Sequence, residues 1–193
     1  MILTLPFLAQ RNYLHGTTLF DALLDEVAAG SSLSYKISRM IFSDRVRLEK
    51  FMETPEHHTA FNVSLSWETP SAKGWIGVVE EPASEIEKRI PYPEENVTSR
   101  AEFAEKSISF SGSSPFSFIS TLVTLHKALL LKNKVADGNG QWVFTRLDLN
   151  GVPKNWEKIT VEMDRVLGRQ LAKSKVIVDE VLIGAIYFSW LPK

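Results

Sequence analysis

Cysteine is absent from the 193-residue sequence, and this removes several kinds of chemistry at once. A chain without thiols forms no disulfides and offers no thiolate ligands to a metal ion. It also has no cysteine nucleophile. A protein without disulfides is compatible with a reducing compartment, and we expect this one to be cytoplasmic.

An excess of charge of one sign is also lacking, because 22 lysines and arginines face 23 aspartates and glutamates, giving a formal net charge of -1. Such a chain has no basic field for nucleic acid, so we expect no nucleic-acid partner. No apolar run reaches the roughly 20 residues of a membrane span. Residues 1–6 lack a basic start and a long apolar segment, so we expect no signal peptide there.

Several motifs that carry chemistry are missing as well. The patterns GxGxxG, GxSxG and HExxH and the P-loop do not occur, which weakens nucleotide-dependent, serine-hydrolase and zinc-protease functions. His57 and His58 are adjacent, but no third ligand follows at a recognisable spacing, so we predict a loop rather than a metal site. We therefore expect neither a cofactor nor a bound metal.

The most apolar stretch of the chain covers residues 116–131 and follows Ser114 and Pro115. It predicts a helix that is buried on nearly every side. A turn-rich segment follows at 137–140, and then four segments with the character of strands, at 141–150, 158–167, 170–179 and 181–190. A single curved antiparallel sheet can cover such a helix.

The N-terminal half has the same order of elements. We predict a strand at 2–8, a helix capped by Thr17 or Thr18, and strands at 33–42, 45–52, 59–69 and 73–80. A charged, proline-bearing segment at 81–96 and a strand at 101–111 lead into the second helix. An offset of 107 residues aligns Arg39 with Arg146 and Ile76 with Ile183. These features predict an internal repeat, with one unit at 1–82, a linker at 83–98 and a second unit at 99–193.

Residues 142–149 (WVFTRLDL), 159–172 (ITVEMDRVLGRQLA), 176–179 and 183–188 resemble the strands after the central helix of hot-dog thioesterases and dehydratases. The N-terminal half resembles the family only through the repeat. The resemblance implies an α+β double hot dog, in which two curved antiparallel sheets each wrap one central helix. If the repeat is chance, another α+β fold remains open.

The resemblance also implies a function, the processing of acyl thioesters on coenzyme A or an acyl carrier protein in fatty acid or polyketide metabolism. The enzyme would be a 3-hydroxyacyl-thioester dehydratase or an acyl thioesterase. The alternative is a non-catalytic hot-dog module that binds an acyl chain or a partner protein. Assembly as a homodimer is left open.

His15 resembles, in placement, the histidine that precedes the helix in hot-dog dehydratases, although the family's proline-rich sequence is absent around it. We predict it as general base, with Asp21 as acid or orienting partner. The alternatives are a loop histidine and a carboxylate that interacts with the helix dipole. Backbone N–H groups and hydroxyls at the helix starts are predicted to bind the substrate carbonyl. These substrate-binding candidates are Gly16, Thr17, Thr18, Ser113 and Ser114.

Each of the remaining candidates has a structural alternative. Ser114 also fits a helix N-cap before Pro115. His126 lies among leucines in the second predicted helix, which favours a core residue. Arg39 and Arg146 fit solvent-facing residues, ion pairs with acids, or anchors for a coenzyme phosphate. The segment before the second helix has no histidine, which suggests that only one of two related sites is active.

Overall fold

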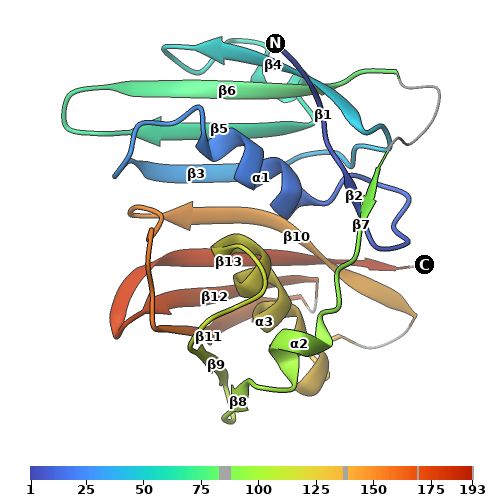
Figure 1. The fold of residues 1–193 in the computed structure, drawn as a ribbon, viewed down its shortest axis with the longest axis vertical. Coiled ribbons are helices and arrows are strands. Elements are labelled where there is room, and N and C mark those ends of the chain that lie inside the picture. Colours follow the sequence, from blue (N-terminus) through green and yellow to red (C-terminus); the bar gives the residue numbers. More distant parts are fainter. Residues whose placement is uncertain (83–87, 137–138, 169, 193) are drawn as a thin grey trace. The chain divides into compact units, whose positions relative to one another are not determined.

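The computed structural model describes residues 1–82, 88–136, 139–168 and 170–192 (Figure 1). The chain divides into two compact units, a first unit of Met1–Pro93 and a second unit of Glu94–Lys193. The predicted linker at 83–98 falls partly on residues 83–87, and the predicted turn at 137–140 falls partly on 137–138. Both of these short segments lie outside the described residues. No helix of the described part is long and apolar enough to cross a membrane.

The first unit combines a short helix with antiparallel strands in the order β1-β4-β6-β5-β3. A separate pair, β2 and β7, is parallel. The predicted strand at 2–8 is divided in two, because the segment changes partner at Leu5 and Pro6. The elements are β1 (Ile2–Thr4), β2 (Phe7–Leu8), α1 (Gly16–Leu24), β3 (Ser32–Ile37), β4 (Arg45–Phe51), η1 (His58–Ala60), β5 (Val63–Glu68), β6 (Lys73–Glu80) and β7 (Arg89–Ile90).

The core of the first unit lies between α1 and the sheet. Leu19, Phe20 and Leu23 are buried on one face of α1, and Phe20 meets the ring of Tyr35 on β3 edge-on at 5.2 Å. Gly77 on β6 lies beneath the ring of Phe61, where an added Cβ would come within 2.3 Å of ring carbons. The glycine is therefore needed for the close approach of this ring to the strand.

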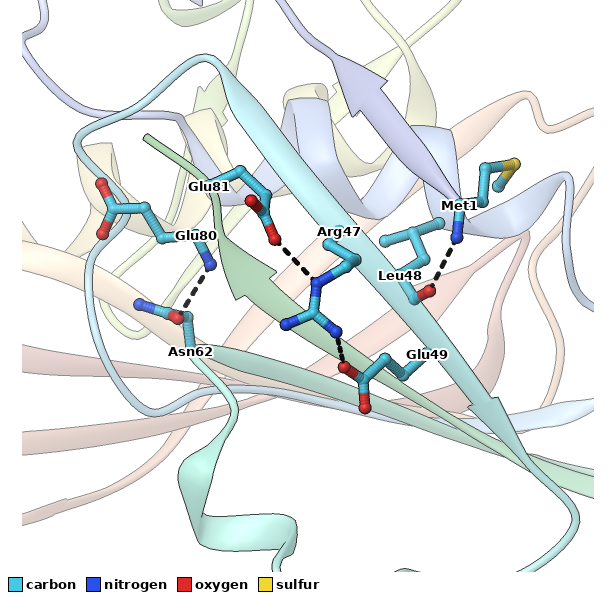
Figure 2. Close-up of polar contacts among 7 residues, drawn as sticks. All are labelled: Met1, Arg47, Leu48, Glu49, Asn62, Glu80 and Glu81. Carbon is cyan, nitrogen blue, oxygen red and sulfur yellow. Dashed lines mark hydrogen bonds and ion pairs between the residues drawn. The ribbon is translucent and has the colours of Figure 1, made fainter. Parts of the chain in front are cut away.

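Two side chains explain why β3 ends at Ile37 and not at the predicted residue 42. The carboxylate of Glu80 accepts the backbone N–H groups of Phe42 and Ser43 at 2.7 and 2.8 Å. Asn62 accepts the backbone N–H of Glu80 at 3.2 Å (Figure 2). These bonds satisfy the backbone of a loop and so replace the ladder bonds of a longer strand.

Arg47 connects β4 with the end of β6 near one edge of this sheet. Its guanidinium donates to Glu81 at 2.7 Å and pairs with Glu49 two residues along the same strand (Figure 2). The N-terminal amine of Met1 donates to the carbonyl of Leu48 at 3.1 Å, which continues the pairing of β1 with β4. The edge of the sheet is thus covered by a short strand and by charge.

The second unit has antiparallel strands in the order β10-β13-β12-β11-β9-β8. The predicted boundaries of β11 agree with the structure, and the predicted strand at 101–111 is divided into β8 and β9. The elements are α2 (Glu95–Thr98), β8 (Glu102–Phe103), β9 (Ser107–Ser111), α3 (Phe118–Lys132), β10 (Gly140–Leu149), β11 (Lys158–Leu167), β12 (Leu171–Val178) and β13 (Val181–Pro192).

Helix α3 lies against the sheet of the second unit and is buried along most of its length (Figure 1). Leu122, Leu125, Leu129 and Leu130 are fully inaccessible to solvent. The predicted buried helix is therefore confirmed, with a start at Phe118, two residues later than expected.

The prediction of two curved sheets that each wrap a central helix is wrong. The described strands, apart from β2 and β7, belong to a single 11-stranded sheet, and α1, α2 and α3 have only 9, 4 and 15 residues. A helix of the length of α1, with one buried face, needs cover on one side only, so it does not require a sheet curved around it.

The strand orders of the two units also differ. In the first unit the fourth strand after the helix, β6, lies between β4 and β5. In the second unit the fourth strand, β13, lies between β10 and β12. Ile76 and Ile183, which the sequence offset aligns, therefore lie on strands with different neighbours. The pattern along the chain repeats more closely than the pairing in space.

Candidate functional site

His15 lies directly at the start of α1. The helix begins at Gly16, and His15 is its N-cap residue with an extended backbone, φ -73° and ψ 136°. The predicted caps at Thr17 or Thr18 are wrong, because both threonines lie inside the first turn. The side chain of His15 makes no capping hydrogen bond.

The imidazole of His15 is enclosed and oriented. Its side chain is 8% exposed, and its Nδ1 lies 2.8 Å from Oγ1 of the fully buried Thr17. The rings of Tyr92 and Tyr13 lie at centroid distances of 5.9 and 6.4 Å. A hydroxyl on one ring nitrogen fixes the plane of the imidazole, which is how proteins position a histidine for proton transfer.

Tyr35 interacts with two of the predicted residues, Gly16 and Asp21. Its hydroxyl donates to the carbonyl of Gly16 at 2.9 Å. The side chain is fully buried, and burial first, then the negative charge of Asp21, raises the pKa of Tyr35 well above its ordinary value. The hydroxyl therefore stays protonated and remains a donor. The charge of Asp21, a half-buried residue of α1, thus acts on Tyr35.

The structure gathers His15, Gly16, Thr17 and Asp21 around the first turns of α1, together with Tyr35, which the sequence analysis did not select. The signal for Tyr35 was its place in the alternation of β3. A tyrosine on the buried face of a strand needs a partner for its hydroxyl. The sequence alone could not name that partner, because β3 and Gly16 meet only in the folded chain.

Ser113 and Ser114 do not cap α3. The N-cap is Ser117, whose side chain accepts the backbone N–H of Ser120 at 3.2 Å. The hydroxyl of Ser114 instead lies 2.6 Å from that of Thr121 and accepts the backbone N–H of Phe116 at 3.1 Å. The N-cap interpretation of Ser114 is therefore wrong, because the loop takes two further residues before the helix begins.

Both serines line a pocket of about 480 Å³ in the second unit. Its walls come from α2 and from the loop between β9 and α3. This pocket also contains Arg100, which the sequence analysis did not select. Its lining residues are Asn96, Ser99, Arg100, Ser113, Ser114 and Pro115.

His126 is a core residue, as its position among leucines indicated. It is fully buried on α3, its Nε2 lies 2.9 Å from the hydroxyl of Ser174 on β12, and its ring meets Phe188 edge-on at 4.6 Å. Burial lowers the pKa of His126 to about 3. The imidazole is therefore neutral across the physiological range.

The other candidates have structural roles. His57 is exposed, with its ring 5.4 Å from that of Phe61, and no group of three metal-binding side chains occurs in the described part of the chain. Arg39 donates to the carbonyl of Ala60. Arg146 pairs with Asp148 at 2.9 Å, which is the ion-pair alternative predicted for it.

No family model and no curated protein sequence matches the chain. Among solved structures, it is similar to the dehydratase domain of PpsC from Mycobacterium tuberculosis, solved in complex with C12:1-CoA. The TM-score is 0.53 over 93% of this chain and 85% of that one, at 9% identity.

Two further structures are less similar. One is a bifunctional dehydratase-cyclase domain in ambruticin biosynthesis, with a TM-score of 0.49 over 93% of this chain and 83% of that one, at 12% identity. The other is a putative thioesterase II from Thermobifida fusca, with a TM-score of 0.46 over 94% of this chain and 87% of that one, at 10% identity. The similarity to the PpsC domain supports a hot-dog fold that this chain matches in part. At 9% identity it concerns the fold and not the activity.

Proposed function

We propose that the chain processes acyl thioesters, as a dehydratase-like or thioesterase-like enzyme. The observation that carries this proposal is His15 at the start of α1, enclosed and oriented by Thr17. Support also comes from the similarity in fold to a dehydratase domain that was solved in complex with C12:1-CoA. Fold by itself does not imply function, so the proposal depends on the residues of this chain.

In this proposal His15 is the general base. It takes a proton from the carbon next to the thioester carbonyl in a dehydration, or from a water molecule in a hydrolysis. The backbone N–H groups of Gly16, Thr17 and Thr18 belong to the first turn of α1, which leaves them without partners inside the helix. They would stabilise the negative charge that develops on the carbonyl oxygen.

Asp21 acts through Tyr35 in this scheme. The charge of Asp21 helps to keep the Tyr35 phenol protonated, and the phenol donates to the Gly16 carbonyl next to His15. Asp21 would accordingly be a positioning residue. Ser113 and Ser114 line the pocket of the second unit, and their contact with a substrate stays a prediction.

The alternative is a non-catalytic module that binds an acyl chain or a partner protein. One observation favours it. The segment before α3 carries serines where the segment before α1 carries His15.

The test is a panel of acyl-coenzyme A and 3-hydroxyacyl thioesters, with hydrolysis and dehydration both followed by mass spectrometry. His15→Ala is expected to lower turnover at least about 100-fold, because a positioned general base contributes 10²–10⁴ in rate. His57→Ala is the matched control, since His57 is exposed and lies on a different loop. Circular dichroism would establish that both variants remain folded.

The outcomes separate the two functions. Turnover by the wild type that His15→Ala leaves unchanged would remove His15 from the mechanism. If no substrate of the panel reacts but acyl thioesters bind, the binding module is the better description.

A further inference from the structure

Arg100 is the only cationic side chain that lines the pocket of about 480 Å³ in the described part of the second unit. It follows α2, and its guanidinium lies 4.8 Å from the ring centroid of Phe110 on β9. It donates to the carbonyls of Ser113 and Ser111 at 3.0 and 3.5 Å. Stacking on an aromatic ring together with bonds to fixed carbonyls holds an arginine in one orientation.

The guanidinium retains donors for a further partner. A guanidinium has five N–H groups, and the two bonds to carbonyls leave three of them. Among the described residues no carboxylate pairs with Arg100, which contrasts with Arg146 and its partner Asp148. No aspartate or glutamate lines the pocket. The pocket therefore carries a positive charge that the described part of the chain does not neutralise.

The serines of the pocket differ in what they can still donate. The hydroxyl proton of Ser99 is donated to the carbonyl of Glu95 at 2.6 Å. Thr121 donates its own proton to the carbonyl of Ser117, so Ser114 must donate the proton in their 2.6 Å contact. The protons of both Ser99 and Ser114 are therefore already used.

Two neutral donors remain beside Arg100. The hydroxyl of Ser113 and the side-chain amide of Asn96 have no hydrogen-bond partner among the residues that the structure describes. The chain reaches Ser113 through Gly112, whose φ of 85° lies in the region that glycine adopts without strain. The backbone N–H of Gly112 donates to the carbonyl of Glu157 at 2.8 Å, so the approach to Ser113 is fixed.

We propose that this pocket binds the phosphate group of a small organic phosphate ester, with Arg100, Ser113 and Asn96 as the donors. Phosphate offers several strong acceptor oxygens, and arginine binds it through charge-assisted hydrogen bonds. The pocket is wide open to solvent, so an organic group attached to the phosphate can extend out of it. This phosphate site deepens the proposed function. It rests on that function in one respect, because both assign Ser113 to ligand binding.

Two pairs of probes test the proposal. Each pair compares a phosphate ester with the same molecule without phosphate, and the two pairs distinguish a pantetheine phosphate from a nucleotide phosphate. The first pair is 4′-phosphopantetheine and pantetheine, and the second is adenosine 3′-monophosphate and adenosine. Titration calorimetry with the whole chain at fixed salt is expected to give saturable binding of at least one phosphate ester. Its partner without phosphate is expected to bind at least about tenfold more weakly, as for a lost hydrogen bond to a charged group. Equal binding within both pairs, or no binding in either, would overturn the proposal.

Variants assign the binding to the pocket. Arg100→Gln is expected to weaken the phosphate ester at least about tenfold, because it removes the charge. Arg165→Gln removes the same charge from an exposed arginine of the same unit, outside the pocket, and should bind as the wild type does. Ser113→Ala should weaken binding more than Ser99→Ala, because only Ser113 has a hydroxyl proton to offer.

Ser113→Asp keeps the proposal testable if Arg100→Gln fails to fold. Arg100 contacts the backbone carbonyl of Ser113, so this change leaves that bond in place and adds a carboxylate that competes with the phosphate. Loss of phosphate-ester binding is expected, and undiminished binding would contradict the proposed site. Binding is measured without turnover, so an inactive protein that still binds the ester would refute the proposed enzyme and not this pocket.

Discussion

Tyr35 illustrates at the scale of a residue how one buried hydroxyl can organise a segment far away in the sequence. Its hydroxyl reaches the carbonyl of Gly16, and its ring packs edge-on against Phe20 of α1. The tyrosine thus contributes both apolar contact and a hydrogen bond to the start of the helix. His15 directly precedes this supported residue.

Tyr35→Phe is expected to destabilise the protein by about 1–2 kcal/mol, because the buried hydroxyl and the half-buried carbonyl of Gly16 lose their hydrogen bond while the ring contacts remain. Urea unfolding measures this change. Tyr13→Phe is the matched control, since the hydroxyl of Tyr13 has no hydrogen-bond partner among the described residues, and it should change stability by less than about 0.5 kcal/mol. An equal effect of both variants would show that the Gly16 bond contributes nothing.

The start of α3 shows, at the scale of an element, how a local pattern can fit two boundaries. The sequence Ser-Pro at 114 and 115 is typical of an N-cap followed by the first helical residue. The chain instead forms a turn, in which Ser114 bonds to Thr121, and begins the helix at Phe118 after Ser117. Two serines satisfy the capping pattern, and tertiary contacts select the second.

Ser117→Ala is therefore expected to lower the free energy of unfolding by about 1 kcal/mol, the usual cost of a lost N-cap. Ser113→Ala in the same loop removes a hydroxyl without a partner in the described chain, so it should leave stability within about 0.5 kcal/mol of the wild type. Thermal or urea unfolding compares the two. If the two serines prove equivalent, the cap assignment is wrong.

His126 affects the stability of the whole molecule, because it connects α3 to the sheet through Ser174 in a fully buried position. Burial lowers its pKa to about 3, whereas an unfolded histidine has a pKa of about 6.5. Between these two values the unfolded state binds the proton more readily than the folded state. Acid therefore favours unfolding in that window, and above pH 6.5 this histidine has no effect on the pH dependence.

The expected loss of stability from His126 is about 1.4 kcal/mol for each pH unit below 6.5, as an upper bound, until the pH approaches 3. His126→Gln removes the titrating group, so the difference in unfolding free energy between variant and wild type should change with this slope. His57→Ala should show the wild-type slope, because that ring is exposed. Parallel curves for His126→Gln and the wild type would contradict the assignment.

The sequence by itself determined the type and position of most elements. The predicted strands at 73–80 and 158–167 coincide with β6 and β11, and the buried helix lies within two residues of α3. This success has a local cause, since alternation every two residues and apolar spacing every three or four are properties of neighbouring residues. The selection of His15 depended on its place before a predicted helix and on the resemblance of that place to the histidine of hot-dog dehydratases.

Only the tertiary structure decided how the elements pair. It placed the strands of the described chain, apart from β2 and β7, in one 11-stranded sheet, gave β6 and β13 different neighbours, and brought Tyr35 to Gly16 and Arg100 to Ser113. These contacts join residues that are distant in sequence, and their partners are chosen by burial and hydrogen bonding across the fold. A repeated local pattern is compatible with more than one such pairing, so strand order lay beyond what local periodicity could determine.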